Sequence, residues 1–399
     1  MIKFALKNMA IKKVQIILIV LSIVISAGIG VLAFNVSNQV SDGITSNAGY
    51  YSLIVGPAGS KTQLAMNTMY FSDEPLGTIP YSVVSNLAME QGVRKVIPFT
   101  MADSYNGSSV IGTTSDYLLD KELLDGSLFD DSQGMQAVVG YKVAKYNDLK
   151  VGDIIYTSHS ASGLDKHEQG IVVCGILKES YSSFDTAVFT QTKTIWEMHD
   201  HGEEESGEHE EHQGHGHQKT VCAVLVSTQN PGVAVQLVEK YDGTVVENQG
   251  ESCTLQAIEP MDAVRAVLND ADDTKYIVFV LCAVILIMNI MIISIITLLN
   301  MYHSAKEIAL MRLIGISMRK INLLYLIQNS IIGFISTLLA FFVSRACLLL
   351  MNDYVSSMGV VLNMGKVYPL EIIILVGVFI ISVLPTAIWT FAMSRKDSI

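Results

Sequence analysis

The chain has 399 residues, of which 50% are hydrophobic and only 16% are charged, against the roughly 25% of an ordinary soluble domain. Its mean hydropathy is +0.41 and its formal net charge is −12. This composition excludes a wholly soluble protein, and the acidic balance argues against a nucleic-acid partner.

Four long apolar runs predict transmembrane helices at 14–34, 276–299, 321–345 and 371–394. Each is long enough to cross a bilayer, which takes about 20 helical residues. Residues 1–13, in which lysines alternate with apolar side chains, predict an amphipathic helix on the inner membrane surface. The first run is longer than the apolar part of a cleaved signal peptide, so we expect an uncleaved anchor.

Basic residues predict the orientation of the chain. Lysines precede the first run, basic side chains fill the loop 300–320, and Arg395 and Lys396 follow the fourth run in the tail 395–399. By the positive-inside rule both termini are therefore cytoplasmic. Residues 35–275 and the short loop 346–370 then lie outside the membrane.

The outer segment 35–275 predicts an α+β domain, because short β-branched runs bounded by turn residues alternate with helical stretches. Its last part, 259–275, predicts a stalk helix leading into the second span. The segment carries 34 Asp and Glu against 14 Lys and Arg. The predicted fold is thus a membrane protein of four transmembrane α-helices, with an α+β extracytoplasmic domain inserted between helices 1 and 2.

The chain shows no sequence motif of an enzyme. It has no Walker motif, HExxH helix, nucleophile elbow or paired CxxC, so we expect a non-catalytic protein. Outside the membrane Cys174, Cys222 and Cys253 allow one disulfide, which their spacing does not specify. Arg345 and Glu371 fall near the outer ends of their spans, where we expect them to reach water. No other ionisable group marks an ion path.

A histidine-rich tract at 199–217 holds six of the nine histidines and seven carboxylates. Imidazole with carboxylate suits Zn²⁺ and other divalent transition metals. The irregular spacing predicts several weak, exchanging arrangements rather than one closed site. The alternative is a solvated acidic loop. His159 and His167 either add ligands to the metal or, as we expect, are solvated. The candidate metal ligands are His199, His201, His209, His212, His215 and His217.

The loop 300–320 predicts a short amphipathic coupling helix along the inner surface, with Ile308, Met311, Ile314 and Met318 on one face. Such a helix either anchors the chain at the interface or serves as a lever for a cytoplasmic motor.

Within this loop, "KEIALMRLIGISMRKI" resembles the coupling segment of MacB/FtsX-type ABC transporter permeases, whose pattern is basic–Glu–Ile–Ala–Leu–x–Arg–x–x–Gly–x–Ser and then basic residues. The order of one span, a large outer domain and three further spans is also that of the family. The similarity covers nearly all of the chain except the histidine tract. The matching positions that we assign to coupling are Lys306, Glu307, Arg312, Gly315 and Arg319.

The resemblance implies a multi-pass permease in a bacterial inner membrane, with 35–275 as a MacB-like domain. It implies a homodimer bound to a separate ATPase subunit that holds the ATP, so that the permease needs no intrinsic cofactor. Glu307 and Arg312 would contact the ATPase, and Gly315 would allow a tight turn towards the third span. Motion of the coupling helix would be relayed to the outer domain, which is mechanotransmission. An extracytoplasmic accessory or substrate-binding protein would fit the same scheme.

Together with the histidine tract, the resemblance predicts a permease that exports or handles zinc, another transition metal or a metal-linked substrate. Three alternatives stay open. They are an FtsX-like regulator of an extracytoplasmic hydrolase, a lipoprotein-releasing permease, and a metal-sensing membrane protein without an ATPase.

Overall fold

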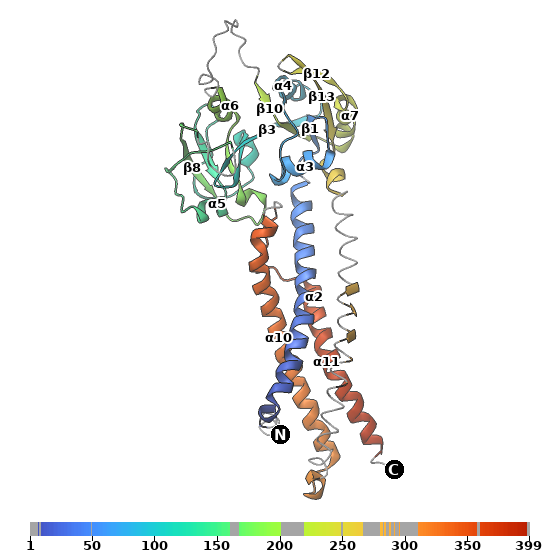
Figure 1. Cartoon of the computed structure of the whole chain (residues 1–399). Helices are drawn as coiled ribbons and strands as arrows, with labels where there is room; N and C mark the ends of the chain where they lie inside the picture. The colour runs from blue at the N-terminus through green and yellow to red at the C-terminus, as the bar shows by residue number, and fades with distance from the viewer. Residues whose placement is uncertain are drawn as a thin grey trace. The chain divides into compact units, whose positions relative to one another are not determined.

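The computed structural model describes residues 7, 9–48, 50–159, 167–200, 219–248, 250–265, 310–356 and 360–396, with isolated residues between 280 and 295. The chain divides into two compact units (Figure 1). One unit contains Met1–Gln39, Ala271–Asn352 and Asn363–Ile399, and the other contains Val40–Asp270 and Asp353–Leu362. We call them the membrane unit and the outer unit.

Three long helices lie over three of the predicted spans. They are α2 (Lys13–Ala48), α10 (Met318–Ser356) and α11 (Pro369–Lys396). Within the described residues, the parts long and apolar enough to cross a membrane are Lys13–Gly43, Met318–Asn352 and Pro369–Ile388. Of the predicted span 276–299 only isolated residues between 280 and 295 are described. The count of four spans therefore stays a prediction.

Parts of three other predicted segments also lie outside the described residues. Of the amphipathic helix 1–13 only 7 and 9–13 are described, and of the stalk 259–275 only residues up to 265, with 260–265 helical. The coupling loop is described from Leu310 onwards.

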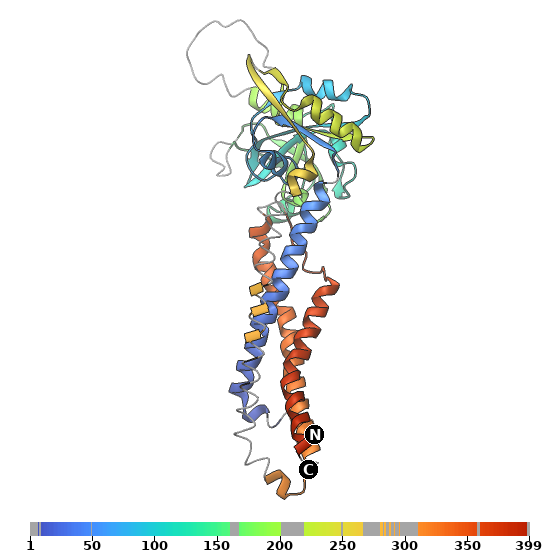
Figure 2. The same cartoon turned by 90° about the vertical axis from the view of Figure 1, so that its right-hand side faces the viewer.

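The three long helices pack against one another in the membrane unit, where they run side by side in both views (Figures 1 and 2). Ile23 and Ala27 of α2, Ala340 of α10 and Val378 of α11 belong to one buried apolar cluster. Asn329 of α10 donates a hydrogen bond to the hydroxyl of Thr386 in α11, a bond between helices of the kind that polar side chains make in membranes.

The expectation that Arg345 and Glu371 reach water is wrong. Nη2 of Arg345 donates to both carboxylate oxygens of Glu371 at 2.7 Å, and these side chains are 11% and 0% exposed. Nδ2 of Asn35 in α2 donates to the same carboxylate at 3.0 Å. A buried charge is tolerated when an opposite charge and hydrogen bonds satisfy it. The pair thereby ties α10 to α11 and, through Asn35, to α2.

The outer unit is α+β, as predicted. Its strands are β1 (Leu53–Pro57), β2 (Ile79–Pro80), β3 (Val93–Tyr105), β4 (Ser108–Thr113), β5 (Leu123–Gly126), β6 (Gln136–Val139), β7 (Ile154–Ile155), β8 (Ile171–Leu177), β9 (Val188–Gln191), β10 (Thr220–Val221), β11 (Ala223–Thr228), β12 (Val245–Asn248) and β13 (Glu251–Ile258). Its helices are α3 (Lys61–Tyr70), α4 (Ser82–Ala88), α5 (Tyr141–Tyr146), α6 (Thr192–Asp200) and α7 (Pro231–Tyr241), with the 3₁₀ turns η1 (Ser115–Leu118) and η2 (Ser183–Thr186).

The described strands form one large mixed sheet and a short pair. The large sheet has the order β12-β13-β1-β11-β3-β4-β9-β6-β8-β5, with β7 paired to β8, and β10 pairs with β2. Two apolar clusters cover different parts of it. One joins β1, β11 and β13 to α4 and α7, and the other joins β6, β8 and β9 to α5 and α6.

Strand β3 belongs to both halves of the sheet, because it is 13 residues long. Its first half pairs with β11 and its second half with β4. The register with β4 shifts between Met101 and Asp103, so one extra residue, Ala102, is accommodated. A bulge of this kind turns the following side chain to the other face of the sheet. Here Ala102 is exposed while Asp103 is buried.

Candidate metal centre

Four side chains with metal-binding atoms converge in the outer unit. They are Asp103, His159, His167 and His199, and one ligand atom from each lies within 4.8 Å of the others. Measured to Oδ1 of Asp103, the distances are 3.2 Å from Nε2 of His199, 3.3 Å from Nε2 of His167 and 3.5 Å from Nδ1 of His159. The three imidazole rings therefore surround a single carboxylate oxygen.

Backbone pairing holds two of the histidines against β3. Ser158 and Ser104 exchange two backbone hydrogen bonds, of 2.8 and 2.9 Å, which place the segment after β7 beside the end of β3. The backbone N–H of His167 then donates to the carbonyl of Thr157 at 2.9 Å. His159 and His167 consequently meet, with ring centroids 4.4 Å apart.

The third histidine comes from α6. In this helix Ile195 and Met198 are buried in the cluster that covers β6, β8 and β9. Gly112 of β4 permits the close approach, because a Cβ there would lie 2.7 Å from Cγ1 of Ile195. His199 lies in the last turn of α6, and its ring centroid is 4.8 Å from that of His159.

The carboxylate of Asp103 is fully buried, whereas His167, His199 and His159 are 10%, 34% and 52% exposed. Burial alone would raise the pKa of Asp103, but the adjacent His199 and His167 hold it below its usual value. The group is therefore an anion at neutral pH. It lies at the inner end of a cluster whose histidines reach the surface.

One buried nitrogen in the cluster is poorly satisfied. Nε2 of His199 is buried and close to Oδ1 of Asp103, yet it makes no hydrogen bond to any described residue. A buried polar atom without a hydrogen bond is costly and calls for an explanation. Three imidazole nitrogens and one carboxylate oxygen are a donor set that binds Zn²⁺ and similar divalent ions.

The site differs from the one that the sequence predicts. Of the tract, only His199 belongs to it, and His201, His209, His212, His215 and His217 lie outside the described residues. The expectation that His167 is solvated is wrong, since its side chain is 10% exposed and faces Asp103. His159 is 52% exposed, so it is solvated as expected, although it too lies beside Asp103. Asp103 itself carries no signal in the sequence, because its place depends on a bulge and on residues 54 to 96 positions away.

The coupling loop is described from Leu310. Residues 310–313 are helical, the chain then turns, and α10 begins at Met318, so the single helical face expected from 308 to 318 is interrupted. Gly315 has φ +91°, its N–H donates to the carbonyl of Arg312 at 2.9 Å, and the N–H of Ile316 donates to the carbonyl of Met311 at 3.0 Å. This is the Schellman arrangement that ends helices, and it favours glycine at the left-handed position.

The side chains around this turn pack together. Met311 and Ile316 contact a buried pair, Ile321 and Tyr325, at the start of α10. Lys306 and Glu307 lie outside the described residues. The assignment of Lys306, Glu307, Arg312, Gly315 and Arg319 to ATPase coupling stays a prediction.

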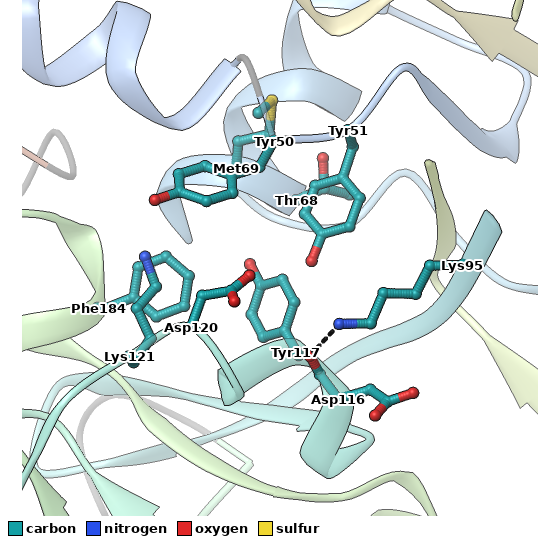
Figure 3. Close-up of a pocket in the computed structure, with 10 residues that line it drawn as sticks. All are labelled: Tyr50, Tyr51, Thr68, Met69, Lys95, Asp116, Tyr117, Asp120, Lys121 and Phe184. Atoms are coloured by element: carbon teal, nitrogen blue, oxygen red, sulfur yellow. Dashed lines mark hydrogen bonds between the residues drawn. The ribbon is translucent and has the colours of Figure 1, made fainter. Parts of the chain in front are cut away.

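A separate hollow lies between η1, η2 and the start of β1 (Figure 3). In it the Lys121 ammonium lies 3.9 Å from the centre of the Phe184 ring and 4.8 Å from that of Tyr50. The hollow has a volume of about 30 Å³, which is the share of one water molecule in the liquid. An adjoining open hollow of about 420 Å³ carries side chains of both charges, including Lys178 and Glu179. This mixture selects no class of ligand.

Comparison with known proteins places both parts of the chain. Residues 15–241 match the model of the MacB-like periplasmic core domain, and residues 277–399 match the model of the FtsX-like permease C-terminal region. None of the curated protein sequences matches the chain.

Two solved structures match part of the chain at low identity. The periplasmic region of MacB from Actinobacillus actinomycetemcomitans is 11% identical, with a TM-score of 0.36, and the match covers 58% of this chain and 98% of that one. The extracellular domain of the noncanonic ABC-type transporter YknZ from Gram-positive bacteria is 15% identical, with a TM-score of 0.33, and the match covers 52% and 98%.

Proposed function

Because the chain belongs to the MacB/FtsX family of ABC transporter permeases, we propose that it couples ATP hydrolysis in a separate ATPase subunit to motion of its outer unit, which handles a transition-metal ion. Permeases of this family work with an ABC ATPase partner. The permease itself supplies no catalytic group in this proposal. Its work is mechanical, by mechanotransmission.

The observation that carries the metal part of the proposal is the convergence of Asp103, His159, His167 and His199. These residues lie in the unit that contains most of the MacB-like domain. The histidine tract begins at His199 and adds five more imidazoles within the next eighteen residues. In this proposal the remaining histidines of the tract bind the same ion more weakly.

The turn at Gly315 supports the mechanical part. A force applied to the helix that carries Arg312 reaches α10 through two backbone hydrogen bonds and the packed side chains of Met311 and Ile316. A short, rigid connection of this kind lets α10 move together with the helix that carries Arg312, as coupling between two conformations requires. Arg312 and Glu307 are the residues that we expect to contact the ATPase.

The remaining partners follow from the same scheme. Two copies of the permease form a homodimer with the ATPase, both termini are cytoplasmic, and an accessory protein outside the membrane exchanges substrate or ion with the outer unit. The four-span arrangement with the stalk 259–275 then links the coupling loop to the outer unit.

The test uses the permease reconstituted with its cognate ATPase in lipid nanodiscs. Glu307→Ala with Arg312→Ala should lower ATPase recruitment and abolish the permease-dependent stimulation of ATP hydrolysis. A matched control is Lys320→Ala, a basic position of α10 to which we assign no coupling role. Undiminished recruitment and stimulation in the double variant would contradict coupling and would favour a metal-binding membrane protein without an ATPase.

The metal part is tested in cells that carry the chromosomal variants. Loss of the metal centre should change growth under zinc limitation or under zinc excess, compared with the unaltered chain. Identical growth in both conditions would remove zinc handling from the proposed function while leaving the coupling test unaffected.

A further inference from the structure

We propose that Asp103, His159, His167 and His199 form a preorganised site that binds one Zn²⁺ ion tightly, and that this site, not the remaining histidines of the tract at 201–217, determines the zinc affinity of the chain. This inference deepens the metal part of the proposed function and rests on it. It needs neither the ATPase nor transport, so it can be tested separately.

The distances within the cluster match those between the ligands of tetrahedral zinc. With zinc bonds to nitrogen and oxygen of about 2.0–2.1 Å, neighbouring ligand atoms of a tetrahedron are about 3.3 Å apart. From Oδ1 of Asp103 the three imidazole nitrogens lie at 3.2, 3.3 and 3.5 Å. Three edges of the tetrahedron are therefore already present, and the other three, between the histidine ligand atoms, are at most 4.8 Å.

The donor set selects among metals. Ca²⁺ and Mg²⁺ prefer oxygen ligands, and Cu⁺ prefers thiolate or thioether ligands. This cluster has three nitrogens, one oxygen and no sulfur. Four protein ligands of this kind suit Zn²⁺, and Co²⁺ serves as its spectroscopic substitute.

The ligands are fixed before an ion arrives. The bulge in β3 turns Asp103 inward, two backbone bonds between Ser104 and Ser158 hold the segment that carries His159, and α6 is packed through Ile195 and Met198. A site whose ligands are already ordered loses less conformational entropy on binding. The tract lacks this advantage, because its spacings specify no single ligand geometry.

The ion would also supply a missing contact. Nε2 of His199 is buried without a hydrogen bond to any described residue, and three nitrogens compete for the same carboxylate oxygen. A zinc ion bonded to all four atoms satisfies each of them at once. Zinc should therefore link α6, β3 and the segment after β7, and should raise the thermal unfolding temperature of the chain.

The experiment uses the full chain purified in detergent without the ATPase and stripped of metal by a chelator. Zinc affinity and stoichiometry are measured by competition with a chromophoric chelator. One tight ion per chain is expected, together with weaker binding by the tract. Replacing 201–217 by a Gly-Ser linker should remove the weak binding and leave the tight ion.

Two variants of the cluster should lose the tight ion. Asp103→Asn and His167→Ala should each weaken it at least a hundredfold, whereas Glu197→Gln, an exposed carboxylate on the same helix as His199, should leave it unchanged. Unfolding temperatures of the metal-free variants, compared with the metal-free parent, show whether each variant folds. If a variant does not fold, the visible absorption spectrum of the Co²⁺-loaded parent shows whether the site is tetrahedral. Tetrahedral Co²⁺ absorbs far more strongly than octahedral Co²⁺.

The proposal is overturned if the linker variant loses the tight ion, if both cluster variants keep it, or if the Co²⁺ spectrum is that of an octahedral ion. If the variants grow normally under zinc limitation and excess, or if ATPase coupling is not found, these binding measurements still stand. Such results would count only against the proposed function.

Discussion

The hydroxyl of Thr157 donates a hydrogen bond of 3.3 Å to Oδ2 of Asp103, while Oδ1 of the same carboxylate faces the three histidines. Both residues are buried. One oxygen of the aspartate is therefore used to fix its orientation, and the other is left for the cluster. This division of labour is typical of metal ligands and of the groups that orient them.

Removing that orienting bond should weaken zinc binding. We expect Thr157→Val, which keeps the shape of the side chain, to lower zinc affinity about 10- to 100-fold, as loss of such outer partners does in other metal sites. The measurement is chelator competition on the full chain. Thr68→Val is the control, because Thr68 is equally buried in the outer unit but bonds to the carbonyl of Leu64 in its own helix. Equal affinities in the two variants would show that Thr157 does not position Asp103.

The turn before α10 should tolerate asparagine better than alanine at position 315. Gly315 has φ +91°, and a side chain in the left-handed region costs about 1–2 kcal/mol, with Asn the best tolerated. Gly315→Ala should therefore reduce permease-dependent stimulation of the ATPase more than Gly315→Asn does. No atom lies within 4 Å of a Cβ at this position, so crowding would not explain the difference. If Ala and Asn behave alike, the backbone at this turn is not the limiting element.

The ion pair between Arg345 and Glu371 should be strongly coupled. Replacing only one partner leaves the other charge buried, which costs about 3–5 kcal/mol. Arg345→Met or Glu371→Leu alone should therefore lower the unfolding temperature sharply, and the double variant should recover most of the loss. The unfolding temperature is measured in detergent. Additive losses in the double variant would mean that the two side chains do not depend on each other.

The buried thiol of Cys222 should be unreactive at neutral pH. Burial raises its pKa to about 11, so at pH 8 about one thiol in a thousand is the reactive thiolate. Its alkylation rate should rise about tenfold for each pH unit up to that pKa, while the half-buried Cys253 reacts first. Peptide mass spectrometry after iodoacetamide treatment measures both rates, and denaturant should equalise them. Comparable labelling of the two thiols in the folded chain would contradict the burial of Cys222.

The cysteine expectation from sequence was left open, and the structure resolves it. Cys174, Cys222 and Cys253 are all free thiols, so none of the disulfides that three cysteines allow is formed among them. Spacing alone could not decide this, since it does not give the distance between two side chains.

Long apolar runs made the membrane helices predictable. The positions of α2, α10 and α11 follow from composition, because a bilayer requires about 20 apolar residues whatever the rest of the fold. Their full lengths do not, since α2 and α10 continue to Ala48 and Ser356, well beyond the predicted runs. The α+β character of the outer unit followed from short β-branched runs between turn residues. The burial of Arg345 and Glu371 could not be predicted from the sequence. Each residue alone, near the end of a span, suggests contact with water, and only the fold brings the two together.

The metal centre was predictable in kind and not in its residues. Histidine-rich composition pointed to metal, but it directed attention to the tract rather than to His159 and His167. Asp103 depends on a bulge at Ala102, and the bulge depends on pairing with β4. Sequence periodicity assigns faces only within a regular strand, so an inserted residue reverses the prediction.

The most direct test of the account is X-ray absorption spectroscopy at the zinc edge on the full chain loaded with one equivalent of Zn²⁺. We expect four nitrogen or oxygen donors at about 2.0–2.1 Å, with outer scattering from three imidazoles, and His167→Ala, which loses the tight ion, should no longer give this spectrum. A shell of six oxygen donors, or a spectrum that His167→Ala leaves unchanged, would contradict the metal centre.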